Sequence, residues 1–243
     1  MFRGSADCAF FLLGGYDILG YQTQIEDLHE ALLEESHTLG DAWREQSYVG
    51  VRQADFSQEG FYDDAVNANH DALSTGPGVS RVLCFGPAGT ATGAPFTGYT
   101  GAMEIQYQRM VSRGALHKAR ATYRGSGKVD EGKILWTHKG TVASSTNSGS
   151  IDAGASSTGG AAYFQLSSFT SAVNATGVRA RVQHSSDDVT FADLVTFTVA
   201  TAAPYGERIE TTATVERYLR MAASYQGGAA PTTAVMFVGF KRY

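Results

Sequence analysis

The chain has few of the residues that would place it in several common protein classes. It contains two cysteines, Cys8 and Cys84, which match neither a CxxC nor a Cys/His zinc spacing and cannot form a disulfide framework. Only 5 of its 243 residues are proline and 28 are glycine, which favours short strands joined by glycine turns over a disordered chain. No apolar run approaches the roughly 20 residues of a membrane-spanning helix, and residues 9–13 are too short for a signal-peptide core. We therefore expect a soluble chain that folds in a cytoplasm and has no membrane partner.

Motifs for catalysis and cofactor binding are missing as well. The six His residues contain no HExxH motif, and no His pair lies with carboxylates at a convincing metal spacing. Residues 125–128 (Gly-Ser-Gly-Lys) lack the earlier Gly and the following Ser or Thr of a phosphate loop. The acidic pairs Glu34/Glu35 and Asp63/Asp64 are adjacent in sequence and point to different faces, so they make poor acid–base dyads. We expect no enzyme activity, no metal and no cofactor.

Acidic and basic residues are unevenly distributed along the chain, although the net charge is only −5. Residues 1–75 contain 14 acidic and 3 basic residues, residues 76–145 contain 3 acidic and 9 basic residues, and residues 146–243 contain 7 of each. A solvated acidic face would explain this distribution. So would an acidic surface that meets a basic surface on the next copy of the chain in a head-to-tail assembly. A nucleic-acid binder is not indicated, because the pI is about 5.7 and no basic stripe is clustered.

A segment of small residues divides the chain. Residues 140–162 are mostly Gly, Ser, Thr and Ala, with Asp152 as their only charge and no helical or strand periodicity. Such a segment has too little apolar surface to offset the entropy of ordering it. We therefore expect a β-domain in residues 1–145, a Gly/Ser-rich linker or surface loop in residues 146–162, and a β-sandwich in residues 163–243.

The first part predicts a β-rich fold with one packed helix. Residues 63–74 have the apolar spacing of a helix, with Asp63 as a candidate N-cap. Residues 26–37 also favour a helix, with a long loop as the alternative. Alternating apolar and polar residues predict strands in residues 8–25 (two strands around a Gly-Gly turn), 47–61, 79–86, 101–113, 115–124 and 134–138.

The second part predicts a small β-sandwich. Six strand candidates follow one another at spacings of roughly 8–16 residues, which is typical of this architecture. They are residues 161–169, 178–185, 192–199, 208–214, 218–225 and 234–240. The whole chain is therefore expected to be all-β with a minor helical content.

The order of these features resembles the major tail tube proteins of long-tailed, non-contractile (siphovirus-type) bacteriophages. The matching features are an early strand pair around Gly15-Tyr-Asp-Ile-Leu-Gly-Tyr21, an acidic segment that runs to Glu35-Ser-His-Thr-Leu-Gly40, and Gly60-Phe-Tyr-Asp63 before a short helix. The C-terminal part resembles the accessory β-sandwich that is fused to such proteins in some phages. The residues that carry this second likeness are 182–191, 215–220 and 237–242.

The resemblance implies a tail-tube-type β-sandwich or barrel that closes with its neighbours into a hexameric ring. Rings would stack into the tail tube, through which DNA passes on ejection without sequence-specific binding. The C-terminal sandwich would decorate the outside of the tube. The implied partners are further copies of this chain and the tail terminator, tail tip and tape measure proteins. The implied location is the virion tail, assembled in the host cytoplasm.

The acidic segment 26–46 is the predicted element for stacking one ring on the next. Its contact residues are expected to be Leu28, Leu32, Leu33, Glu34, Glu35 and Leu39. On the neighbouring subunit they would face the basic region 109–133, with Arg109, Arg113, Lys118 and Arg120 as the partners. We expect the segment to be mobile in the free subunit and ordered in the assembly.

A capsid-decoration protein and a tail-tip adhesin are the alternatives, since either can be a two-part β-protein without an active site. An adhesin would use its C-terminal sandwich to hold carbohydrate, with Tyr205, Tyr218 or Tyr225 stacking on a sugar ring. Otherwise these tyrosines are half-buried strand residues.

Overall fold

The computed structural model describes residues 10–36, 45–125, 127–143, 145–170, 176–227 and 232–243. Of residues 30–36, 45–53 and 232 it describes the backbone alone. The described chain is almost entirely antiparallel β-structure, with one α-helix, α1 (Asn69–Ser74), and one 3-10 turn, η2 (Leu19–Tyr21). This confirms the predicted all-β fold with minor helix. No helix among the described residues is long and apolar enough to cross a membrane.

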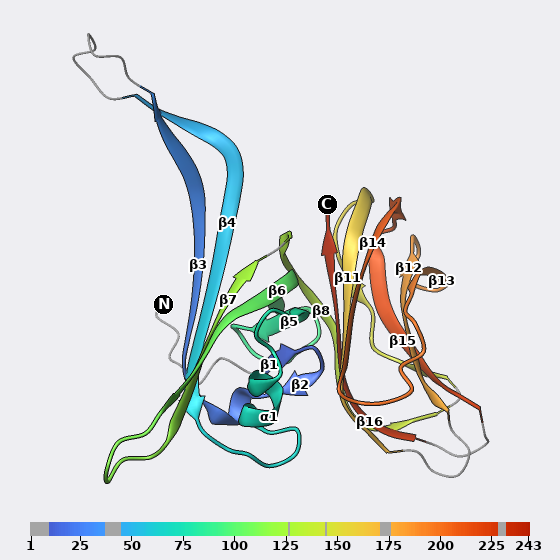
Figure 1. Cartoon of the computed structure of the whole chain (residues 1–243). Helices are drawn as coiled ribbons and strands as arrows, with labels where there is room; N and C mark the ends of the chain where they lie inside the picture. The colour runs from blue at the N-terminus through green and yellow to red at the C-terminus, as the bar shows by residue number, and fades with distance from the viewer. Residues whose placement is uncertain (1–9, 37–44, 126, 144, 171–175, 228–231) are drawn as a thin grey trace.

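Eleven strands form one large sheet that runs through the whole molecule (Figure 1). Its main path has the order β14-β11-β16-β8-β6-β5-β1-β2, and a branch from β6 continues through β7 and β4 to β3. The strands of the N-terminal half are β1 (Phe10–Leu13), β2 (Tyr16–Asp17), β3 (Gln22–Ser36), β4 (Glu45–Phe61), β5 (Ser80–Gly86), β6 (Pro95–Met110), β7 (Lys118–Gly125) and β8 (Val129–Val142). Those of the C-terminal half are β11 (Ser157–Thr170), β14 (Tyr205–Val215) and β16 (Thr232–Arg242).

A second sheet of five strands covers the C-terminal half of the large sheet and makes a sandwich. Its order is β10-β15-β12-β13, with β9 beside β15. Its strands are β9 (Thr146–Asn147), β10 (Ile151–Asp152), β12 (Gly177–Ser185), β13 (Ala192–Thr196) and β15 (Tyr218–Gln226). All six predicted C-terminal strands are present, and apolar residues from both sheets, such as Phe164, Val182 and Met221, fill the space between them.

Two further apolar clusters lie in and beside the N-terminal half. One gathers Phe11, Phe56, Tyr99 and Tyr123 from the large sheet with Leu73 of α1. The other contains residues of both halves, namely Phe10, Leu12, Cys84, Phe96, Ile134, Ala161, Tyr163 and Phe237. The two halves therefore share one apolar boundary as well as one sheet.

The segment 26–37 is expected as a helix or long loop, but its residues 26–36 are instead the main part of strand β3. Residue 37 lies outside the described residues. Strand β3 pairs antiparallel with β4 from Gln22↔Gly60 to Ser36↔Glu45. Its Leu, Ala and Glu residues favour a helix locally, but cross-strand pairing with the alternating sequence of β4 outweighs this weak preference. The helix prediction for this segment is wrong.

The predicted helix 63–74 is present but shorter. Asp63 does not cap it, because its carboxylate accepts a hydrogen bond from the Ala65 N–H (2.9 Å) in a turn that precedes α1. Asn67 has a positive φ of 62°, which prevents a helix from running through this position. The six residues of α1 begin only after it.

Residues 146–162 are not a structureless linker. They contain β9, β10 and the start of β11, and residues 159–162 are buried. At Gly160 an added Cβ would lie 2.4 Å from the Phe240 ring, so close packing requires a small residue here. The domain boundaries at residues 145 and 163 remain a proposal, since β8 of the first part pairs with β16 of the second.

Candidate functional site

Two hairpins leave the body of the molecule in opposite directions (Figure 1). The longer one consists of β3 and β4. Strand β7 accompanies β4 only over Asp55–Phe61, so the rest of the hairpin consists of β3 and β4 alone among the described strands. At about 3.3 Å per residue, the unaccompanied residues 29–36 of β3 extend for about 26 Å.

The β3–β4 hairpin is strongly acidic and has open edges. Its acidic residues are Glu26, Asp27, Glu30, Glu34, Glu35, Glu45, Asp55 and Glu59, against one basic residue, Arg52. Within the described residues, β3 pairs with β4 alone, and β4 has no second partner over residues 45–54. The hairpin therefore offers unpaired backbone groups and negative charge to another molecule.

The base of the hairpin is fastened to the body by a buried tyrosine. Tyr99 of β6 is 1% exposed and donates a hydrogen bond from its hydroxyl to Asp27 Oδ1. His29 Nε2 lies 3.0 Å from the same carboxylate oxygen and 3.3 Å from the Tyr99 hydroxyl. Burial, and then the bonded Asp27 carboxylate, raise the pKa of Tyr99, so the phenol keeps its proton and stays a donor.

The predicted stacking residues lie along this hairpin. Leu28 is on β3 with 51% of its surface exposed. Leu32, Leu33, Glu34 and Glu35 follow on β3, where β7 no longer accompanies the hairpin. Leu39 lies outside the described residues.

The second hairpin, formed by β6 and β7, carries the predicted basic residues. Arg109, Arg113 and Arg120 are exposed. Lys118 is half-buried, and its Nζ lies 2.7 Å from Glu59 Oε1 of the same chain. Arg124 makes a similar bond, with its Nε 3.0 Å from Asp55 Oδ1. Lys118, one of the predicted partners on a neighbouring subunit, is thus already paired within its own subunit, with an acid outside the predicted segment 26–46.

The tip of the β6–β7 hairpin combines positive charge with exposed apolar side chains. Val111 is 68% exposed and Leu116 is 72% exposed. A hollow of about 520 Å³ opens beside them, lined by Tyr62, Arg109, Val111, His117 and Lys118. This surface has the opposite charge to the β3–β4 hairpin and lies at the other end of the molecule (Figure 1).

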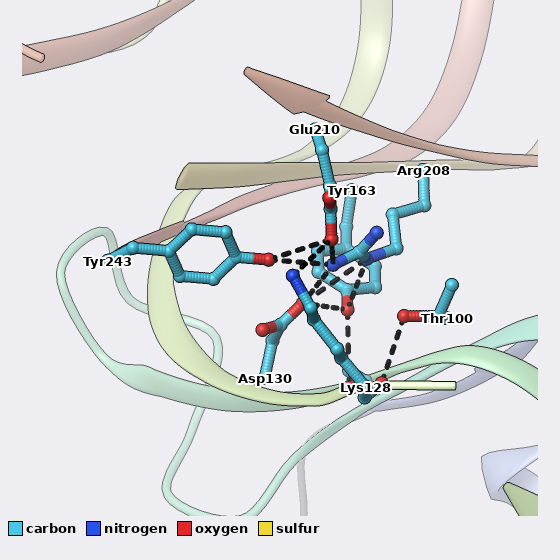
Figure 2. Close-up of polar contacts among 8 residues, drawn as sticks. Thr100, Lys128, Asp130, Tyr163, Arg208, Glu210 and Tyr243 are labelled. Carbon is cyan, nitrogen blue, oxygen red and sulfur yellow. Dashed lines mark hydrogen bonds and ion pairs between the residues drawn. The ribbon is translucent and has the colours of Figure 1, made fainter. Parts of the chain in front are cut away.

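A buried ionic network joins the two halves of the molecule (Figure 2). Arg208 of β14, whose side chain is 7% exposed, donates to Asp130 Oδ2 of β8 (2.7 Å) and to the Tyr163 hydroxyl of β11 (2.9 Å). It also donates to Glu210 Oε1 (2.7 Å). Burial alone would lower the pKa of Arg208, but these hydrogen bonds raise it above its ordinary value.

The outer end of the network holds Lys128 and Tyr243. Lys128 Nζ lies 3.1 Å from Glu210 Oε1 and 4.8 Å from the centre of the Tyr243 ring. Hydrogen bonds from Arg208 and then from Lys128 hold the pKa of Glu210 at about 2. All the charged groups in Figure 2 have partners, so this network positions the two halves and offers no reactive group.

The three tyrosines considered for carbohydrate stacking are half-buried and do not form one platform. Tyr205 belongs to β14 and packs on Phe164, with ring centres 6.0 Å apart. Tyr218 and Tyr225 lie at the two ends of β15 in the other sheet. Groups of His, Cys, Asp and Glu suited to a metal ion are likewise absent from the residues that the structure describes.

Two buried acids, Asp130 and Glu104, were not among the predicted site residues. Both occupy inward positions of alternating strands: Asp130 precedes the buried Gly132 and Ile134, and Glu104 follows the buried Ala102. An acid on the inward face of an alternating strand was the sequence signal that could have identified each of them.

No protein-family model matches the chain, and no curated protein matches it. Several solved structures are similar to it, and they include the following three. A chain of the virion of a native gene transfer agent particle has 14% identity and a TM-score of 0.41, over 54% of this chain and 98% of that one. A chain from the tail of the empty gene transfer agent particle, which has C6 symmetry, has 15% identity and a TM-score of 0.39, over 53% and 97%. The SPP1 Dit protein, described as a paradigm of hub adsorption apparatus in phages that infect Gram-positive bacteria, has 11% identity and a TM-score of 0.35, over 96% and 98%.

Proposed function

We propose that this chain is a structural, non-enzymatic subunit of a phage-type tail, and that it assembles into stacked rings that form the tail tube. The observation that carries the proposal is the pair of hairpins at opposite ends of the molecule, one acidic and one basic and apolar (Figure 1). Two different complementary surfaces on one molecule make head-to-tail contacts, and such contacts either close rings or add subunits without limit.

Within a ring, neighbouring subunits would pair through open strand edges. The described part of β3 pairs on one side only, and the outer part of β4 has no second partner. Unpaired edges of this length are readily completed by a strand of another chain, and closing a ring leaves none exposed. This supports a cyclic arrangement, for which we propose six subunits.

Between rings, the β3–β4 hairpin of one subunit would contact the β6–β7 tip of a subunit in the next ring. Exposed ion pairs contribute only about 0–1 kcal/mol each, so apolar side chains such as Leu28, Val111 and Leu116 would supply most of the contact energy. Charge would set the register and the rate of assembly. Arg109, Arg113 and Arg120 are available for this contact, whereas Lys118 would first have to leave Glu59.

In the virion, we propose that these rings enclose a lumen through which DNA passes on ejection, without sequence-specific binding. The tail terminator, tail tip and tape measure proteins would be the further partners. The C-terminal sandwich would lie on the outside of the tube.

Electron microscopy and sedimentation velocity of the purified chain at high concentration test the proposal. Long tubes support it, and a monomer in the presence of tail-tip partners across a range of salt concentrations contradicts it. Single rings that never stack would contradict the tube and favour the tail-tip alternative. Isolated trimers would favour a capsid-decoration protein.

Paired substitutions show whether the tip of the second hairpin makes the contact. Leu116→Asp places a charge on the β6–β7 tip and should abolish stacking while the subunit stays folded. Val189→Asp is the matched control, because Val189 is 80% exposed on the C-terminal sandwich, away from both hairpins. Equal stacking of both variants would exclude the tip as the contact surface.

A further inference from the structure

Glu104 is a buried carboxyl group at the root of the β6–β7 hairpin. It is 1% exposed, and neither Oε1 nor Oε2 has a hydrogen-bond partner among the described residues. Its cross-strand partner is Tyr123 of β7, which is itself buried. An ionised carboxylate without a partner is highly unfavourable at such a site, so the group is held in its neutral form.

The turn that follows α1 covers this carboxyl group. A Cβ added at Gly76 would lie 1.8 Å from Glu104 Oε2, so the backbone of the turn rests directly on the carboxyl. Gly78 N–H donates to the Glu104 carbonyl oxygen (2.8 Å), and Glu104 N–H donates to the Val79 carbonyl oxygen (3.4 Å). We refer to residues 69–79, which comprise α1 and this turn, as the cover segment.

The Arg81 guanidinium, whose charge acts on Glu104, is already hydrogen-bonded to other groups. Arg81 of β5 donates to the Ala72 carbonyl oxygen (2.5 Å) and to Thr75 Oγ1 (3.0 Å), both at the end of α1. Burial raises the pKa of Glu104 to about 8, and the positive charge of Arg81 opposes this rise only in part.

The other side chains around Glu104 are uncharged, and the nearby acids of β4 are paired with basic residues on the opposite face of the sheet. Tyr123 faces it from β7, and Gln58 of β4 lies beside Tyr123. Tyr107 follows on β6 and is hydrogen-bonded to His70 of α1 (2.7 Å). Asp55 and Glu59 of β4 bond to Arg124 and Lys118 on the opposite face.

We propose that Glu104 is a proton-dependent latch that holds the cover segment closed over the root of the β6–β7 hairpin. The carboxyl group lies beneath Gly76 without a hydrogen-bond partner among the described residues, a position that its neutral form tolerates better than its ionised form. The ionised carboxylate needs a polar partner. Either water solvates it after the cover segment opens, or Arg81 pairs with it and leaves the carbonyl oxygen of Ala72. In both cases the contact between α1 and the hairpin root is loosened.

The direction of the pH effect follows from the two states. In the open state Glu104 is solvated and loses its proton near the ordinary value for glutamate, whereas in the closed state it keeps the proton until about pH 8. The open population should therefore rise roughly tenfold for each pH unit between these values and level off above pH 8.

Hydrogen exchange of the unassembled subunit at a series of pH values tests the latch. Protection factors of the cover segment should fall roughly tenfold per pH unit from pH 5 to 8 in the unchanged protein. They should not depend on pH in Glu104→Gln. Glu131→Gln changes an exposed glutamate on β8 and should keep the slope of the unchanged protein. The same slope in Glu104→Gln as in the unchanged protein would overturn the proposal.

Direct titration of the Glu104 carboxyl group tests the proposal without a substitution. The carbon-13 signal of the Glu104 carboxyl in the unchanged protein should titrate with a midpoint close to 8. A midpoint at the ordinary value for glutamate would overturn the proposal. Neither measurement requires rings or tubes, so failure of the latch is distinguishable from failure of the proposed function.

Discussion

Gly160 shows, at the scale of one residue, why the Gly/Ser-rich stretch is structured. The residue is buried in β11, and a Cβ there would meet the Phe240 ring at 2.4 Å and the Lys241 carbonyl oxygen at 2.5 Å. The composition of residues 140–162 predicts flexibility, because composition reports the entropy of the chain. It does not report which positions lie under a large neighbour and need a small side chain for that reason.

Gly160→Ala should therefore destabilise the fold, because the added methyl group meets backbone and a packed aromatic ring. We expect the free energy of unfolding to fall by about 1–3 kcal/mol, measured by chemical denaturation. Gly149→Ala lies in the same stretch, where a Cβ would meet nothing within 4 Å, and should leave stability unchanged. Equal stability of the two variants would restore the linker interpretation.

For the two buried acids, the sequence predicts the position of each side chain but not its partners. Strand alternation places Asp130 and Glu104 on inward faces, and this much can be predicted from the sequence. The partner of Asp130 cannot be predicted, because Arg208 follows 78 residues later and is brought near by the successive pairing of β8, β16, β11 and β14. That the Glu104 carboxyl has no hydrogen-bond partner among the described residues is likewise a property of the packed structure.

At the scale of elements, the strands were predictable and β3 was not. Most strands alternate clearly, and their pairing completes what the pattern indicates. In residues 26–37 the helix propensity is a stronger signal than the alternation of apolar and polar residues, so the local sequence predicts a helix, which is wrong. Long antiparallel pairing with β4 decides the conformation, and local propensity does not describe the effect of a partner strand.

The attachment of the β3–β4 hairpin depends on the Tyr99 hydroxyl. Tyr99→Phe keeps the buried ring beside Phe56 but removes the donor to Asp27. We expect a loss of about 1.5–3 kcal/mol in the free energy of unfolding, as for other hydrogen bonds to charged groups. Amides of residues 24–29 should exchange faster in the unassembled subunit, while those of the C-terminal sandwich should not change.

Tyr225→Phe is the matched control for this prediction. It removes a hydroxyl that makes no hydrogen bond among the described residues, so exchange in the hairpin should stay as it is. If Tyr99→Phe also leaves residues 24–29 unchanged, the hairpin is held by strand pairing alone.

At the scale of the whole molecule, the network of Figure 2 holds the two halves together. Asp130→Asn would leave the buried Arg208 with Glu210 as its remaining anionic partner. Removing one member of a buried ion pair typically lowers the free energy of unfolding by about 3–5 kcal/mol, and we expect a loss of this order in denaturant unfolding.

Asp193→Asn is the control, since Asp193 pairs with Arg181 at 3.3 Å and its side chain is 40% exposed. It should change the free energy of unfolding by less than about 1 kcal/mol. If both variants lose equally little stability, the Arg208 network does not hold the halves together. Two separate unfolding transitions in Asp130→Asn would indicate that the halves have become independent units.

The shared sheet could not be predicted from the sequence for a related reason. The pairing of β8 with β16 joins residues about a hundred positions apart, and no local pattern specifies it. Two β-rich parts on either side of a Gly/Ser-rich stretch therefore suggest two separate domains. The structure adds a common sheet, a common apolar cluster and the Arg208 network between them.

The head-to-tail contact, which rests on the proposed function, makes a prediction that only the whole assembly can test. Leu32→Asp alters the β3–β4 hairpin but leaves the β6–β7 tip intact, and Leu116→Asp does the reverse. Each variant alone should form rings that do not stack. When preformed rings of the two are mixed, the intact hairpins of one should meet the intact tips of the other. Each ring has only one competent face, and pairing with a ring of the other variant uses it, so the product should be pairs of rings and not tubes.

Sedimentation velocity and electron microscopy distinguish these products. Long tubes from the mixture would mean that the two hairpins are not the two sides of one contact. Tubes from either variant alone would mean that its hairpin does not take part in stacking. Val189→Asp should form tubes of normal length, because Val189 lies on the C-terminal sandwich, away from both hairpins. Pairs of rings in the mixture require two different surfaces that recognise each other, as the opposite charges and opposite positions of the hairpins predict.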